Sequence, residues 1–293
     1  MSKTDSKTWT ILELINETTA YFKKYNIENP RLNIERILED VLKLKRMDLY
    51  LNFDRPIQNS EIVIIREMVK KRACHIPLYY ILGHAPFLNW NFKVNPSVLI
   101  PRPETELLVE KTMLLVNNME FSHFHILDIG TGSGCIAISL AKSISNVTVT
   151  ACDNSMHALN IAKENAQNLG VLEKINFVFM DILQTDISFP DIPFQIIVSN
   201  PPYIKHNEFY SLQEEVKQEP VSALSGGKDG LDFYNKITDK ISDLIIHGGY
   251  VLMEIGSDMG KEVKAIFKKN TSCTSVEIFK DYQSLDRIVV AKF

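Results

Sequence analysis

The second half of the chain alternates apolar runs with helical segments, and this alternation restricts the possible folds more than any other feature. Seven runs have the length and the continuous apolar character of buried strands. Strands that are apolar on both faces belong to a parallel sheet that helices cover on each side. The runs are residues 123–130, 146–153, 175–181, 194–200, 249–256, 275–280 and 286–293. We therefore predict an α/β fold with a seven-stranded, mostly parallel sheet.

The last two runs indicate how this sheet ends. They are separated only by residues 281–285, which are too few for the helical crossover that joins parallel neighbours. We therefore expect residues 275–280 and 286–293 to pair antiparallel at an edge of the sheet.

Residues 1 to about 85 show helical periodicity instead. Apolar side chains recur at three- and four-residue spacing in residues 10–25 and again in residues 32–42. Ser60 is expected to cap a further helix with the sequence "EIVIIREMVKKR". These patterns predict a small N-terminal helical domain.

A stretch rich in proline and β-forming residues, 86–103, follows this domain and predicts a β-hairpin linker. A helix should then begin near Glu104. The expected organisation is a helical domain in residues 1–85, the linker in 86–103 and the α/β domain in 104–293.

Composition excludes several classes of protein. The 293 residues are 45% apolar, enough for a large core, and their net charge is −4. Residues 1–85 carry 14 Lys and Arg against 11 Asp and Glu, so a nucleic-acid partner is not expected. No apolar run approaches the roughly 20 residues of a membrane span, and the N-terminus lacks the apolar segment of a signal peptide. The four cysteines are far apart, which predicts neither a metal site nor disulfides and fits a cytoplasmic protein.

A glycine-rich turn, "LDIGTGSGCIA" at residues 127–137, follows the first predicted strand and precedes a helix. Such a turn brings backbone N–H groups close to a ligand. A dinucleotide site would need a third glycine at position 135, but Cys135 stands there. The D-x-G-x-G-x-G pattern resembles that of S-adenosylmethionine-dependent methyltransferases. The candidate cofactor contacts in this turn are Gly130, Thr131, Gly132, Ser133 and Gly134.

Two carboxylates end the next two predicted strands. Asp153 can accept hydrogen bonds from both ribose hydroxyls of a bound nucleoside. In the fold that the sequence resembles, an acidic residue at the position of Asp181 holds the adenine amino group, with the backbone of Ile182 beside it. Either aspartate alone could serve as a helix cap or turn residue. Together with the glycine turn they predict one nucleoside-sized pocket.

The sequence "NPPY" follows the strand 194–200, which must end at Asn200 because proline cannot continue a buried strand. The Asn200 side-chain oxygen and the Pro201 carbonyl are two acceptors that can hold both N–H bonds of a planar NH₂ group. Pro202 stiffens the turn, and Tyr203 is expected to stack over the planar group. These four residues are the candidate catalytic and substrate-binding residues, and Asn200 is also a candidate cofactor contact. His206 follows this motif and could act as a base, but an exposed loop histidine is usually solvated.

Four longer stretches resemble the bacterial peptide-chain release factor glutamine N5-methyltransferases in both sequence and order. They are residues 98–110, 127–141, 199–204 and 219–234. The resemblance covers nearly the whole chain and implies a Rossmann-like class I methyltransferase fold. It also implies methyl transfer from S-adenosylmethionine to the glutamine amide in the Gly-Gly-Gln motif of release factors, with the N-terminal helices as the docking surface for that protein.

Two other functions remain open at this point. "NPPY" is also typical of enzymes that methylate the amino group of adenine or guanine in nucleic acids, although those should carry a basic target-recognition domain. A non-catalytic scaffold that binds S-adenosylmethionine or docks proteins would not need Asn200 and Tyr203.

Two further stretches have alternative interpretations. "PRPET" at residues 101–105 either only stiffens the start of a helix or also lines the pocket at the methionine end of the cofactor. "LSGGKDG" at residues 224–230 is either a flexible loop or a segment that shapes the groove for the protein substrate.

Overall fold

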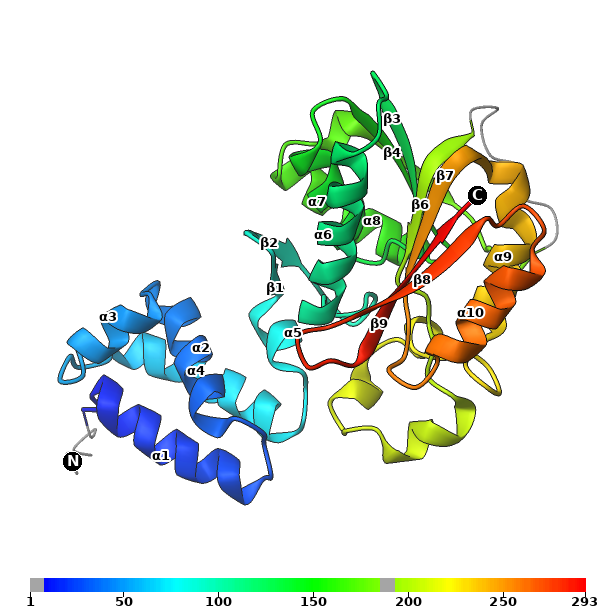
Figure 1. Cartoon of the computed structure of the whole chain (residues 1–293). Helices are drawn as coiled ribbons and strands as arrows, with labels where there is room; N and C mark the ends of the chain where they lie inside the picture. Colours follow the sequence, from blue (N-terminus) through cyan, green and yellow to red (C-terminus); the bar gives the residue numbers. More distant parts are fainter. Residues whose placement is uncertain (1–7, 185–192) are drawn as a thin grey trace, which may run out of the picture. The chain divides into compact units, whose positions relative to one another are not determined.

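The structure is a computed structural model, and it describes residues 8–184 and 193–293. The chain divides into two compact units (Figure 1). The first comprises the residues up to Gly83 together with Glu214–Gln218, and the second comprises His84–Gln213 and Glu219–Phe293. Within the described residues, no helix is both long and apolar enough to cross a membrane.

The first unit consists of short helices around an apolar core. The Thr10 hydroxyl caps the first helix by accepting a hydrogen bond from the backbone N–H of Glu13 at 3.3 Å. Pro30 opens the second helix, in which Ile34 and Ile37 are fully buried at helical spacing. The helices are α1 (Ile11–Lys24), α2 (Pro30–Leu42), α3 (Arg46–Leu51), α4 (Asn59–Ala73) and α5 (Leu78–Leu82).

The predicted cap of α4 is wrong. The helix begins at Asn59, and its N-cap residue is Gln58 rather than Ser60. The Glu61 carboxylate accepts a hydrogen bond from the backbone N–H of Gln58 at 2.8 Å. This backbone N–H therefore has a partner at the start of the helix. Ser60 therefore lies within the first turn.

The second unit opens with a β-hairpin. β1 (His84–Phe87) and β2 (Trp90–Lys93) pair antiparallel, so the hairpin begins two residues before the expected stretch 86–103. The backbone N–H of Leu88 in its turn donates to the Glu106 carboxylate at 2.7 Å. Glu106 belongs to α6 (Pro103–Asn117), which starts with a proline in its first turn. The hairpin is thus tied to the helix that follows it.

The sheet of the second unit has seven strands in the order β5-β4-β3-β6-β7-β9-β8. β3 to β7 run parallel, whereas β9 is antiparallel to both of its neighbours. The predicted fold class and the antiparallel edge are both confirmed. The strands are β3 (Phe124–Ile129), β4 (Val147–Asp153), β5 (Ile175–Phe179), β6 (Phe194–Ser199), β7 (Ile245–Glu254), β8 (Ser275–Lys280) and β9 (Asp286–Lys292).

Two apolar cores cover the faces of this sheet because successive strand residues point to opposite sides. Ile126 belongs to the core beneath α6, α7 (Cys135–Ser143) and α8 (Met156–Asn168), and Leu127 belongs to the opposite core. α9 (Asp232–Leu244) and α10 (Gly260–Lys269) pack on that second side (Figure 1). The strand order reverses between β3 and β6, so the loops after these strands diverge and leave a crevice at the carboxyl edge.

Candidate active site

The glycine turn follows β3 directly and forms the first wall of this crevice. Gly130, Gly132 and Gly134 have φ values of 74°, 56° and 82°, in the left-handed region that favours glycine. A Cβ on Gly134 would also lie 2.8 Å from Cδ1 of Ile138 and 3.1 Å from Cβ of Ala162. Glycine is therefore required at position 134 both for the turn and for the close packing of α7 on α8.

Asp153 connects the end of β4 to this turn. Its carboxylate accepts hydrogen bonds from the backbone N–H groups of Gly132 and Ser155, both at 2.9 Å. The cap of α8 is Ser155, whose hydroxyl accepts from the backbone N–H of Ala158. Asp153 is therefore not the helix cap, and burial raises the pKa of its carboxyl group.

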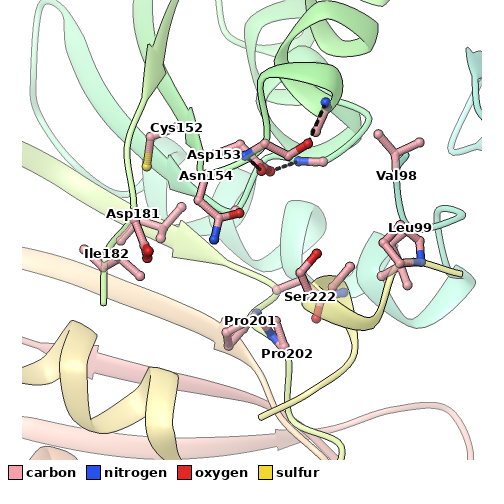
Figure 2. A pocket seen from close by; sticks show the side chains of 18 of the residues that line it. Val98, Leu99, Cys152, Asp153, Asn154, Asp181, Ile182, Pro201, Pro202 and Ser222 are labelled. Carbon is pink, nitrogen blue, oxygen red and sulfur yellow. Dashed lines mark hydrogen bonds between the residues drawn. The ribbon is translucent and has the colours of Figure 1, made fainter. Parts of the chain in front are cut away.

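A cavity lies at the carboxyl edge of the sheet, where these loops meet (Figure 2). Several predicted site residues line it, and they come from the ends of four neighbouring strands. They are Gly130, Gly132, Asp153, Asp181, Ile182, Asn200, Pro201 and Pro202. Figure 2 shows Asp181 and Ile182 on one side of the cavity and Val98 and Leu99 on the other.

Other predicted residues build the site without being among its lining residues. The Thr131 hydroxyl donates to Asp128 at 2.7 Å, and the Ser133 carbonyl accepts from the Asn165 side chain at 2.8 Å. Thr131 and Ser133 are buried, so these contacts fix the shape of the glycine turn. The Tyr203 ring packs partly against the second core, and its hydroxyl donates to Glu254 at 3.3 Å.

The side chain of Asn200 is oriented by a hydrogen bond to a buried threonine. β6 ends at Ser199, and the Asn200 Nδ2 group donates to the Thr105 hydroxyl at 3.0 Å. The Thr105 hydroxyl in turn donates to Glu254 Oε2 at 2.6 Å. Because Nδ2 is occupied by Thr105, the Oδ1 atom remains as the acceptor for a ligand.

A buried carboxylate joins two chain segments that line the cavity. Glu219 accepts hydrogen bonds from the backbone N–H of Ile100 at 3.1 Å and from the Arg102 guanidinium at 2.5 Å. Leu99, which precedes Ile100, and Ser222, three residues after Glu219, both line the cavity. This ion pair therefore ties "PRPET" to the segment that precedes "LSGGKDG".

The "LSGGKDG" segment packs closely against the backbone that follows Asn200. The Gly226 N–H donates to the Ile204 carbonyl at 3.0 Å, and the Gly227 carbonyl accepts from the His206 N–H at 3.0 Å. A Cβ on Gly226 would lie 2.8 Å from the Pro202 carbonyl oxygen. The segment therefore backs the "NPPY" turn, whereas the His206 residue is exposed.

Comparison with known proteins identifies the family. The family models described as PrmC N-terminal domain and methyltransferase small domain match residues 13–83 and 108–228. A protein from Chlorobaculum tepidum named release factor glutamine methyltransferase is 40% identical over 290 residues, which cover 97% of each chain. The chain belongs to the release factor glutamine methyltransferase family. A protein of the same name from Geobacter sulfurreducens is 37% identical over 284 residues, with 96% of each chain covered.

The family predicted from the sequence motifs is thereby confirmed. Among solved structures, a methyltransferase from Pyrococcus furiosus aligns with a TM-score of 0.50 and 18% identity. The alignment covers 70% of this chain and 90% of that one, and it bears on the fold alone.

Three polar residues behind the cavity of this release factor glutamine methyltransferase family member were not predicted from the sequence. They are Thr105, Glu219 and Glu254. Thr105 and Glu219 lie in the stretches 98–110 and 219–234 that resemble the family, but nothing in those stretches indicates their contacts. Glu254 is an acidic residue at the carboxyl end of a strand, which is the signal that identified Asp153. That rule could have found it.

Asp128, next to the end of β3, has a carboxyl group with a raised pKa. Complete burial raises the pKa of this carboxyl group from 3.8 to about 7. One oxygen accepts from Thr131 and from the backbone N–H of Ala137, and the other has no partner among the described residues. Below about pH 7 the folded protein therefore favours the protonated acid.

We expect Asp128→Asn to change how stability depends on pH. Between pH 4 and about 7 the unfolded carboxyl ionises while the folded one keeps its proton, so the wild type loses stability as pH rises. Asparagine does not titrate, and its stability relative to the wild type should rise over this range by at most about 4 kcal/mol. Urea unfolding of both proteins at several pH values measures this difference. Parallel curves would mean that Asp128 ionises normally in the folded protein.

Proposed function

We propose that the protein transfers a methyl group from S-adenosylmethionine to the side-chain amide nitrogen, N5, of the glutamine in the Gly-Gly-Gln motif of peptide-chain release factors. The observation that carries the proposal is the meeting of the glycine turn, the strand-end carboxylates and Asn200 around one cavity. The names of the full-length relatives support the choice of substrate.

The residues around the cavity fit a nucleoside cofactor. S-adenosylmethionine supplies an electrophilic methyl group on a sulfonium sulfur. We propose that Gly130–Gly134 hold its methionine part through backbone groups, and that the Asp153 carboxylate accepts from its ribose. Asp181 and Ile182 are proposed to hold its adenine. The positive φ values of the turn and the half-buried carboxylates support this assignment.

The protein's contribution to the chemistry is orientation. An amide nitrogen is a weak nucleophile because its lone pair is delocalised, so its position must be fixed before it reacts. Asn200 Oδ1 and the Pro201 carbonyl are proposed to accept its two N–H bonds, with Pro202 holding that carbonyl in direction. Tyr203 is only partly buried against the second core, and we propose that the rest of its ring stacks over the amide plane, while its hydroxyl contact with Glu254 limits the tilt of the ring.

The helices of the first unit are proposed to dock the release factor. Several of their apolar side chains are exposed, which supports a protein partner, and they include Met47, Leu51 and Val63. We also propose a cytoplasmic location, because the proposed substrates act in translation.

The test is methylation of a purified release factor. Full-length protein with S-adenosylmethionine should add one methyl group to the Gly-Gly-Gln glutamine, located by peptide mass spectrometry. A release factor with that glutamine replaced by alanine is the control and should remain unmodified. Labelling of DNA or RNA but not of the release factor would favour a nucleic-acid amino-methyltransferase. Cofactor binding without any transfer would favour a non-catalytic scaffold.

A further inference from the structure

Asparagine poses a problem of orientation at the proposed methyl-transfer centre. Its side chain has an oxygen and an NH₂ group of nearly the same shape, and a half-turn about the last bond exchanges them. Only the oxygen can accept an N–H bond of a substrate amide. If Asn200 presented its own NH₂ group instead, two donors would face each other, and the substrate nitrogen would not be held. Some other group must therefore select one orientation.

We propose that Thr105 and Glu254 are positioning residues that hold the Asn200 amide with Oδ1 toward the substrate. The inference rests on the proposed function, because it assigns these residues to the same transfer. The Thr105 hydroxyl has one proton and donates it to Glu254 Oε2 at 2.6 Å. Because this proton is already used, the Thr105 oxygen can act toward Asn200 only as an acceptor. Asn200 Nδ2 donates to it at 3.0 Å.

The fold brings these groups together from distant parts of the chain. Thr105 lies in the first turn of α6, which begins at Pro103. Met253 pairs with Ser199 in the β6–β7 ladder, so Glu254 and Asn200 follow at the same level of adjacent strands. The carboxylate therefore lies next to the strand end that carries the amide clamp.

Burial makes this arrangement rigid. Thr105 and Glu254 expose only 2% and 1% of their surface. Burial raises the pKa of the Glu254 carboxyl, while the hydrogen bond from Thr105, the charge of Arg287 and the hydrogen bond from Tyr203 oppose this rise and favour the ionised form. The hydroxyls of Thr105 and Tyr203 each donate to one of its oxygens. A carboxylate in such a place is costly unless it is hydrogen-bonded, and here both oxygens are used. With both hydroxyl protons engaged, no free donor of this group can turn toward Asn200 Oδ1.

The experiment compares variants of the full-length protein. Thr105→Val keeps the shape of the side chain but removes the hydroxyl, while Thr105→Ser keeps the hydroxyl. Glu254→Gln keeps the shape but adds a donor, which competes with the Thr105 proton. Thr112→Val is the matched control, because Thr112 is a fully buried threonine on the same helix whose hydroxyl donates only to the Leu108 carbonyl at 2.8 Å.

We expect Thr105→Val and Glu254→Gln to lower kcat for release factor methylation by about 10- to 100-fold. Thr105→Ser and Thr112→Val should stay within about threefold of the wild type. KM for the release factor and the dissociation constant of S-adenosylmethionine should change by less than about threefold for all variants, because the loss lies in orientation rather than binding. Thermal melting checks folding, and Glu254→Gln and Thr105→Ser keep the test available should Thr105→Val not fold.

A second readout does not depend on turnover. In protein labelled with ¹⁵N on the asparagine side chains, the NH₂ resonance of Asn200 is assigned by its loss in Asn200→Ala. Thr105→Val and Glu254→Gln should shift this resonance, whereas Thr112→Val should leave it unchanged.

Three results would overturn the proposal. One is an equal loss of kcat in Thr105→Val and Thr112→Val, which would mean that the hydroxyl serves only in packing. Another is a loss in Thr105→Ser as large as in Thr105→Val. The third is wild-type kcat in Glu254→Gln. A wild-type protein that leaves release factors unmodified would instead refute the proposed function, and the Asn200 resonance would still test the hydrogen-bonded network.

Discussion

Replacing Asn200 with alanine is expected to lower kcat for release factor methylation by about 100- to 1,000-fold. Alanine removes the Oδ1 acceptor, so the substrate amide keeps only the Pro201 carbonyl as a partner and can rotate about that single hydrogen bond. The glycine turn and Asp153 remain in place, because neither contacts the Asn200 side chain through a hydrogen bond. S-adenosylmethionine should therefore still bind.

The measurement combines single-turnover methylation with calorimetric titration of S-adenosylmethionine. Asn207→Ala is the matched control, since Asn207 is an exposed asparagine in the segment after "NPPY". It should keep wild-type activity. Turnover by Asn200→Ala at near the wild-type rate would show that Asn200 does not hold the substrate amide.

The strands of the fold could be predicted from the sequence because burial on both faces leaves a local signal. Ile126 and Leu127 enter opposite cores, and each needs an apolar side chain whatever its neighbours in space are. Helix boundaries depend on finer contacts. The start of α4 was missed because the Glu61 carboxylate and the Gln58 N–H allow an earlier first turn than Ser60 suggested.

The residues of the candidate site also differ in how far the sequence alone predicts them. The glycine turn, Asp153 and Asn200 were predictable because strand ends in a parallel sheet converge, so position along the chain implies position in space. Thr105 was not predictable, because its partner Asn200 lies 95 residues away and no periodicity links them. Glu254 ends β7 at the same edge, so its position could be predicted by the same rule as that of Asp153.

Glycine loops are the hardest part to interpret from sequence. Glycine permits both mobility and close approach of two backbones, and only the neighbouring atoms distinguish these roles. "LSGGKDG" left both interpretations open. In the structure, a Cβ on Gly230 would lie 2.5 Å from the Tyr203 carbonyl oxygen, and a Cβ on Gly226 would lie 2.7 Å from Tyr203 Cα. Close approach is the role that these contacts support.

Gly226→Ala is accordingly expected to lower kcat by about 100-fold, although Gly226 is not proposed to touch any substrate. The added Cβ would meet Tyr203 Cα at 2.7 Å, the Pro202 carbonyl oxygen at 2.8 Å and Gly230 Cα at 2.9 Å. All three are backbone atoms that cannot rotate away, so the "NPPY" turn must shift. A displacement of a few tenths of an ångström or more would move the Pro201 carbonyl and Asn200 together.

Gly249→Ala separates this effect from a general loss of stability. Its Cβ would meet Ile245 Cγ1 at 2.6 Å and the Gln195 carbonyl oxygen at 2.9 Å, which is a clash of similar severity in the same unit. Ile245 and Gln195 lie near the amino-terminal ends of β7 and β6, away from the carboxyl edge that carries the cavity. Both variants should lose about 1 to 3 kcal/mol of stability in urea unfolding, because overpacking strains the backbone. Only Gly226→Ala should lose activity per folded molecule, since only its clash moves the residues that hold the amide; equal activity in the two variants would mean that the glycine segment does not position the turn.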